Sequence, residues 1–107
     1  MEIFEVQVTY PNEASARKAA DHLLRKHLVA CVNFNAIQSI YWWNNELQED
    51  NEFIAHFKTL TSHLQILLDE IKSTHPYHVP AILYWKVNTS AEYYQWVEEV
   101  VNPGKAE

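Results

Sequence analysis

Hydrophobic and polar residues follow two different periods along the chain, and the changes of period predict its elements. Apolar and polar side chains alternate over residues 3–10, which is typical of a strand. From Asn12, which can cap a helix, to about residue 28, the apolar residues recur at helical spacing. The residues of this helical stripe are Ala16, Ala19, Ala20, Leu23, Leu24, His27 and Leu28.

A long hairpin is predicted next. A second strand begins near Ala30 and alternates up to Tyr41. Asn44 and Asn45 then favour a tight turn, because Asn tolerates positive φ better than other non-glycine residues. The pattern indicates the returning strand firmly only over residues 52–58.

Two helices and one strand follow the hairpin. Thr61 or Ser62 caps a helix that ends before Pro76, with apolar residues at positions i, i+3, i+4 and i+7. Residues 81–87 are almost continuously apolar, which predicts a central strand covered on both faces. A last short helix is expected to turn four side chains inward, namely Tyr93, Trp96, Val97 and Val100.

The order β-α-β-β-α-β-α predicts an α+β fold, the ferredoxin-like sandwich with an added C-terminal helix. The 107 residues form one domain, 1–107, in which about 102–107 is expected to be a flexible tail. The first arm of the hairpin is much longer than the usual strand of roughly five or six residues. Tyr41, Trp42 and Trp43 lie on this arm, so we expect it to meet copies of the same chain.

The composition excludes several classes of function. The net charge of −6 and the absence of a Lys/Arg cluster argue against nucleic acid as a partner. Gly104 is the only glycine, so no glycine-rich loop can bind a nucleotide cofactor. No apolar run is long enough to span a membrane, and the N-terminus is expected to be a strand and not a signal peptide. One cysteine excludes an intrachain disulfide and favours a cytoplasmic location.

Candidate metal ligands are found in two separate segments of the chain. His75 and His78 flank a Pro-Tyr pair, and Cys31 opens the second strand. Together they form a soft ligand set suited to copper, provided that they converge. The plainer alternative is that His75 ends a helix, His78 lies in a turn and Cys31 is a small core residue. Lys58 would need an acidic neighbour or a bound anion if it points inward.

Four segments, read in order, resemble one known family. They are VTYPNEASARKAADHLLRKHLVACVN, SIYWWNNELQED, FKT and HPYHVPAI. The chain is similar over nearly its whole length to CutA, the divalent-cation tolerance protein family. The positions that match the family pattern are Cys31, Tyr41, Trp43, Lys58, His75, Pro76, Tyr77 and Pro80.

The resemblance implies a ferredoxin-like subunit in a tight homotrimer, with the long hairpin strands pairing across subunits. It also implies a link to copper or other divalent metals and no established enzyme activity. This chain departs from the family pattern at four positions, one of which is Thr74, where some members have a histidine before His75. It has Asn45 where the family usually has Gly, and His78 and Ala81 where the family usually has Glu.

Three functions are therefore open. The first is a non-catalytic homotrimer that binds or senses divalent metal through Cys31, His75 and His78. The second is a regulatory trimer like the PII-type signalling proteins, whose ligand would lie between subunits near Lys58 and Tyr77. The third is a cofactor-free enzyme with a buried histidine as base, although no catalytic signature is present in the sequence. Tyr41, Trp42 and Trp43 are expected at the trimer interface in the first two cases.

Overall fold

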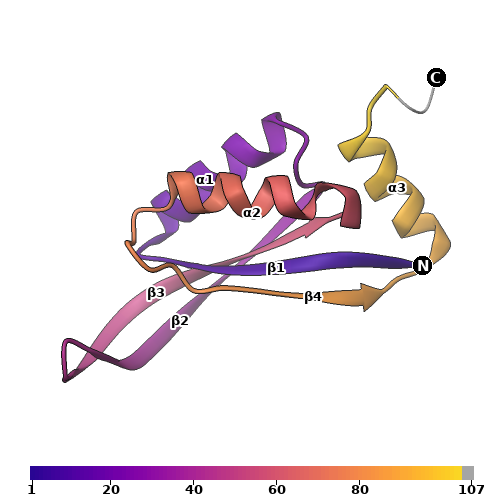
Figure 1. The fold of residues 1–107 in the computed structure, drawn as a ribbon. Helices are drawn as coiled ribbons and strands as arrows, with labels where there is room; N and C mark the ends of the chain where they lie inside the picture. The colour runs from indigo at the N-terminus through magenta and orange to yellow at the C-terminus, as the bar shows by residue number, and fades with distance from the viewer. Residues whose placement is uncertain (105–107) are drawn as a thin grey trace.

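The computed structural model describes residues 1–104; the predicted tail residues 105–107 lie outside the described part. One antiparallel sheet has the strand order β2-β3-β1-β4, with helices packed against it (Figure 1). In chain order the elements are β1 (Glu2–Tyr10), α1 (Glu13–Arg25), β2 (Cys31–Trp43), β3 (Glu46–Thr59), the short 3-10 helix η1 (Thr61–His63), α2 (Leu64–Thr74), β4 (Ile82–Asn88) and α3 (Ala91–Val101). The predicted ferredoxin-like fold is confirmed. Among the described residues, no helix is long and apolar enough to cross a membrane.

Helices α1 and α2 cover one face of the sheet (Figure 1). The alternating apolar residues of β1 point toward them, and Val6 and Val8 are fully buried. Leu23 of α1 and Ile71 of α2 belong to the same buried cluster. Burying a large apolar side chain contributes about 1.5–3 kcal/mol, so this layer supplies most of the stability of the fold.

Helix α3 covers only one end of the opposite face. Its Val97 and Val101 pack with Ile3 of β1 in a smaller buried cluster. Beyond this cluster the face carries polar side chains that contact one another across the strands. His56 is hydrogen-bonded to Asn35 at 2.6 Å between Nε2 and Oδ1.

Helix α1 ends at Arg25 and not near residue 28 as predicted. His27 has a φ of 57°, in the left-handed region that ends many helices. The Leu28 amide donates to the Leu23 carbonyl at 3.1 Å, and the His27 amide donates to the Leu24 carbonyl at 3.0 Å. These two bonds satisfy the last carbonyls of the helix without a glycine, and they turn His27 away from the predicted core stripe.

Strand β4 is an edge strand, so the predicted central position is wrong. It pairs only with β1, and Leu83, Tyr84 and Trp85 are 54%, 50% and 40% exposed. The apolar run had predicted a strand buried on both faces. In a single chain, its large side chains are instead exposed. Trp96 of α3 is likewise 43% exposed and does not point inward, because the helix covers only the end of the sheet.

The hairpin of β2 and β3 is an uninterrupted ladder. Its register runs from Cys31 opposite Lys58 to Trp43 opposite Glu46, so β3 begins well before the predicted residue 52. Asn44 and Asn45 have φ values of 52° and 63°, as a two-residue type I′ turn requires, so the predicted turn is confirmed. The far end projects from the body, and the molecule measures 53 × 24 × 21 Å (Figure 1).

Candidate functional site

The ring nitrogens of His75 are both occupied within the chain. Its Nε2–H donates to the Thr9 carbonyl at 2.7 Å, and its Nδ1 accepts the Tyr77 amide at 2.9 Å. The ring also stacks on Tyr10, with 4.5 Å between centroids. Burial lowers the pKa of His75, an effect that the bond to the Thr9 carbonyl partly opposes. A neutral ring held in this way has no lone pair free for a metal.

Cys31 lies far from His75. It faces Lys58 across the hairpin, and Lys58 in turn faces Glu5 of β1, whereas His75 bonds to Thr9 of that strand. The offset of four residues corresponds to about 13 Å along the sheet. Within residues 1–104, no three His, Cys, Asp or Glu side chains come together as a metal site.

The predicted metal set of Cys31, His75 and His78 is therefore not assembled within one chain. The HPYHVP turn meets the middle of the hairpin and not its Cys31 end, because Tyr77 contacts Glu52. The half-buried Cys31 has Tyr93 of α3 as its neighbour. The pKa of Tyr93 is raised, mainly because the phenol is partly buried and also because the Cys31 thiol lies beside it.

Lys58 has partners inside the chain. Its Nζ lies 3.4 Å from Glu5 Oε1, and it also donates to Asn33 Oδ1. The acidic neighbour that an inward-pointing Lys requires is thus Glu5. Tyr77 contacts β3 at Glu52, six residues before Lys58, so the two side chains lie apart along the strand in one chain. A ligand cleft between subunits near Lys58 and Tyr77 stays a prediction.

A pocket of about 630 Å³ lies where the HPYHVP turn passes the hairpin. Its walls include Ser39, Tyr41 and Trp43 from β2, Glu52 from β3, and Tyr77 and His78 from the turn. The turn is part of the loop between α2 and β4 in Figure 1. The volume falls within the range of roughly 300–1,000 Å³ that is usual for small-molecule sites.

Two phenol–carboxylate pairs lie at this pocket. The Tyr77 hydroxyl donates to Glu52 Oε2 at 2.6 Å, and the Tyr41 hydroxyl donates to Asp50 Oδ2 at 2.5 Å. Burial and the Glu52 carboxylate raise the pKa of Tyr77, and the hydrogen bond to Asp50 raises that of Tyr41. Both phenols therefore stay protonated as donors, and the negative charge of the site resides on the carboxylates.

The three aromatic residues expected at an interface lie on different faces of the hairpin. Tyr41 and Trp43 belong to the pocket face. Trp42 points to the other face, where it lies opposite Leu47. Trp42 is 71% exposed and Leu47 is 61% exposed, so this pair is an uncovered apolar patch within one chain.

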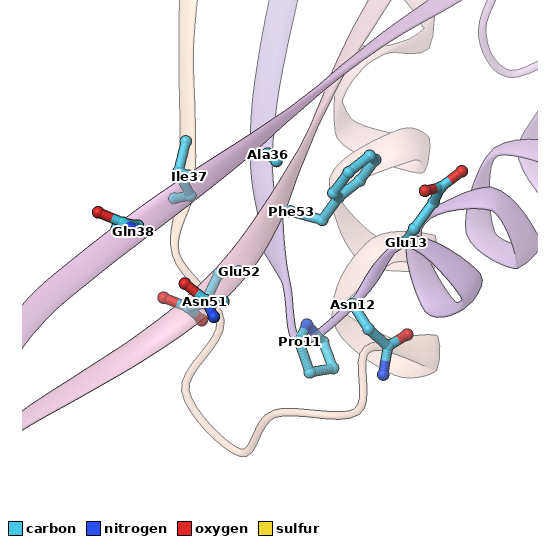
Figure 2. A pocket seen from close by; sticks show the side chains of 9 residues that line it. All are labelled: Pro11, Asn12, Glu13, Ala36, Ile37, Gln38, Asn51, Glu52 and Phe53. Atoms are coloured by element: carbon cyan, nitrogen blue, oxygen red, sulfur yellow. The ribbon is translucent and has the colours of Figure 1, made fainter.

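A second hollow of about 440 Å³ lies beside the start of α1 (Figure 2). Phe53 points toward α1 there, whereas its neighbour Glu52 points to the other side of β3. The Asn12 side chain is already used to accept the Ser15 amide at 2.8 Å. The hollow has a single aromatic side chain, Phe53, among its lining residues, whereas the pocket beside the HPYHVP turn has three.

The sequence pattern of the family described as "CutA1 divalent ion tolerance protein" matches residues 4–100. The chain belongs to the CutA family. A CutA divalent-cation tolerance protein of Thermotoga maritima is 42% identical over 97 residues, which are 90% of this chain and 96% of that protein. Protein CutA of Homo sapiens is 39% identical over 95 residues, which are 87% of this chain and 53% of that protein.

Solved CutA structures have the same fold. CutA1 from Pyrococcus horikoshii superposes with a TM-score of 0.88 at 35% identity, covering 91% of this chain and 96% of that one. CutA from Synechococcus elongatus superposes with a TM-score of 0.91 at 27% identity, covering 94% and 91%. The resemblance seen in the sequence segments is confirmed.

The acidic side of the pocket, Glu52 with Asp50 beside it, is not among the functional residues predicted from the sequence. Their positions were nevertheless available. A two-residue turn at Asn44-Asn45 fixes the register, which places Ser39 opposite Asp50 and Ile37 opposite Glu52. Both carboxylates therefore lie on the same face as Tyr41.

Proposed function

We propose that the chain is a non-catalytic CutA-family protein that assembles as a homotrimer and acts in divalent ion tolerance. The observation that carries this proposal is the exposed pair of Trp42 and Leu47, on a hairpin end that nothing else in residues 1–104 covers. Large apolar side chains grouped in this way mark contact surfaces between proteins.

The sheet edges support the same proposal. Strands β2 and β4 are the two outer strands, so each leaves one row of backbone groups unpaired within the chain. Exposed Leu83 and Trp85 lie on β4. Because the two edges lie on opposite sides of the sheet, an edge of one copy can pair with the other edge of the next. Such head-to-tail contacts close into a ring when the rotation permits, and the CutA resemblance implies a ring of three.

Light scattering at micromolar concentration tests the assembly. We expect the mass of three chains for the unmodified protein and a smaller mass when Trp42 and Leu47 are both replaced by Ser. The matched control is Ile66→Ser on α2, which changes a 58% exposed apolar side chain away from the hairpin. A single-chain mass for the unmodified protein would end the proposal.

Copper binding is proposed only as a property of the assembly. His75 is already bonded at both nitrogens, so Cys31 and His78 are the remaining soft donors of the predicted set. One chain does not bring them together, and a site would need donors from different copies. Calorimetric titration with Cu²⁺ of Cys31→Ser and His78→Ala variants tests this, and unchanged affinity in both would remove these ligands.

A second candidate function is small-ligand binding, in the manner proposed above for PII-type trimers. The pocket beside the HPYHVP turn favours it, because it combines aromatic walls with an acidic side chain. A thermal-shift screen tests this function directly, and a screen without any stabilising compound would count against it. The cytoplasmic location stays a prediction.

A further inference from the structure

We propose that the pocket beside the HPYHVP turn binds a small organic ammonium ion. The inference rests on the small-ligand function proposed above and names the chemical class of its ligand. Three aromatic side chains line the pocket, namely Tyr41, Trp43 and Tyr77. Trp43 is 49% exposed and Tyr41 is 38% exposed, so part of each ring remains open to a ligand. Aromatic faces attract a cation through the ring quadrupole, and Trp does so most strongly.

The charges around the pocket have one sign. Glu52 lines the pocket, and Asp50 accepts a hydrogen bond from the hydroxyl of Tyr41, which also lines it. Of the residues that line it, none is Lys or Arg. The Tyr41 and Tyr77 hydroxyls donate to Asp50 and Glu52, and these phenols add no positive charge that would offset the carboxylates. A phosphate or carboxylate ligand would meet this charge without a compensating cation.

The same arrangement disfavours a bare divalent ion. Hard cations such as Ca²⁺ take six to eight oxygen ligands, and Mg²⁺ demands near-octahedral geometry. Glu52 is the only carboxylate among the lining residues, and it already accepts a hydrogen bond from Tyr77. An organic ammonium ion needs fewer oxygens, because it is bulky and weakly hydrated and can place its alkyl groups against the rings.

The alternation of the hairpin keeps this pocket apart from the patch proposed for assembly. Trp43 and Glu52 point to one face, whereas Trp42 and Leu47 point to the other. Copies that associate through Trp42 and Leu47 therefore leave the pocket face for a ligand. The chain also supplies matched control positions, because Glu49 lies on the face away from the pocket and the exposed Trp96 lies on α3.

Binding of choline, compared with its uncharged carbon analogue 3,3-dimethylbutan-1-ol, tests the proposal on the full chain. The two probes have nearly the same shape and differ in charge. We expect choline to bind at least about tenfold more tightly in a calorimetric titration, as a cation–π contact together with a carboxylate would give. Shifts of the Trp43 indole N–H in nuclear magnetic resonance spectra would locate the probe.

The variants separate the two contributions. Glu52→Gln keeps an acceptor for Tyr77 but removes the charge, and Trp43→Leu keeps an apolar wall but removes the ring. Each should weaken choline binding about fivefold to tenfold while leaving the alcohol unchanged. The controls Glu49→Gln and Trp96→Leu should leave the binding of both probes unchanged. Light scattering of every variant reports whether the assembly is intact.

Several outcomes would overturn the proposal. Equal affinity for choline and the alcohol would show that charge is not recognised. Tighter binding of inorganic phosphate than of choline would assign the pocket to anions. No saturable choline binding by an intact trimer would reject the ligand class, while leaving the proposed assembly standing. A single-chain mass, by contrast, would reject the assembly and leave choline binding to be judged by the titration.

Discussion

The hairpin of β2 and β3 has two regions that share one backbone ladder but are stabilised differently. In the root, next to the helices, Ala55 and Phe57 are fully buried in the main core. In the tip, residues 38–51, the ladder continues in the same register, yet Trp42 is 71% exposed. The root is therefore part of the fold, whereas within one chain the tip is held only by its cross-strand pairs.

The difference shows that the length of the hairpin does not serve the stability of a single chain. Each cross-strand pair contributes roughly 0.2–1 kcal/mol, and an isolated two-stranded hairpin is marginally stable at best. Exposed aromatics on such a ribbon are a liability unless they contact something else. The exposure of Trp42 and Leu47 in the tip is therefore what supports the contact surface proposed above.

The largest expected effect comes from breaking the root. Phe57→Ala removes a fully buried ring from the core and should lower the free energy of unfolding by about 3–5 kcal/mol. Leu47→Ala in the tip removes a 61% exposed side chain and should cost the fold itself much less. Urea unfolding of both variants at one protein concentration measures the contrast, and equal losses would contradict the distinction between root and tip.

Removing the tip altogether should abolish assembly but not folding. Residues 40–49 can be replaced by Asn-Gly, because Ser39 and Asp50 are opposite each other and can close a new two-residue turn. We expect a folded chain whose mass falls from three chains to one. Light scattering gives the mass, and circular dichroism shows whether the helices remain. A shortened chain that still forms the full assembly would show that the tip is not required for it.

The free energy of unfolding should fall in acid because of His75, which holds the Tyr77 amide beside the boundary between root and tip. Burial lowers the pKa of His75 from its ordinary value of 6.5, so the folded state resists its protonation. The resulting stability is present above pH 6.5 and is lost as the pH falls through the lower folded-state pKa. Protonation also places a hydrogen on Nδ1, which breaks the bond from the Tyr77 amide.

His75→Gln should therefore flatten the fall in unfolding free energy on acidification, because glutamine does not titrate. The control is His78→Gln, which changes an exposed histidine in the same turn. Urea unfolding at several pH values between 7.5 and 4.5 measures both slopes. The assignment to His75 is wrong if the two variants and the unmodified protein have the same pH dependence.

The smallest expected effect is a gain in stability at the turn that ends the tip. Asn45 has a φ of 63°, which glycine adopts without steric cost, so Asn45→Gly should stabilise the turn by up to about 1 kcal/mol. Asn45→Ala should destabilise it by about 1 kcal/mol, because alanine is strained in the left-handed region. Thermal unfolding of both variants and of the unmodified protein, at one protein concentration, measures the sign of each change. Two changes of the same sign would contradict this account of the turn.

The sequence predicted the elements because their periods are local. The alternation of β1, the stripe of α2 and the Asn-Asn turn all depend on nearby residues, and the structure confirms them. The prediction that β4 is a central strand was wrong. An apolar run in the sequence does not show whether its side chains are buried within their own chain or left at an edge. The predicted end of α1 was wrong because His27 adopts the left-handed conformation that ends the helix, and this conformation is usually taken by glycine.

The candidate site was less predictable than the fold. Cys31, His75 and His78 are suitable ligand types, but whether they converge depends on which end of the hairpin meets the HPYHVP turn. That choice is made by long-range contacts such as Tyr77 with Glu52, which no local pattern contains. Likewise, the availability of His75 depends on the Thr9 carbonyl, whose orientation follows from the packing of β1.

The register of the sheet also sets an order of events in time. Trp43 meets Glu46 across a two-residue turn, whereas Glu2 meets Asn88 from near the other end of the chain. Closing a hairpin takes about 1–10 μs, and pairing of distant segments is slower because more chain must be ordered first. We therefore expect the hairpin to close before β1 pairs with β4. The assembly proposed above would come later, because association of separate chains depends on their concentration.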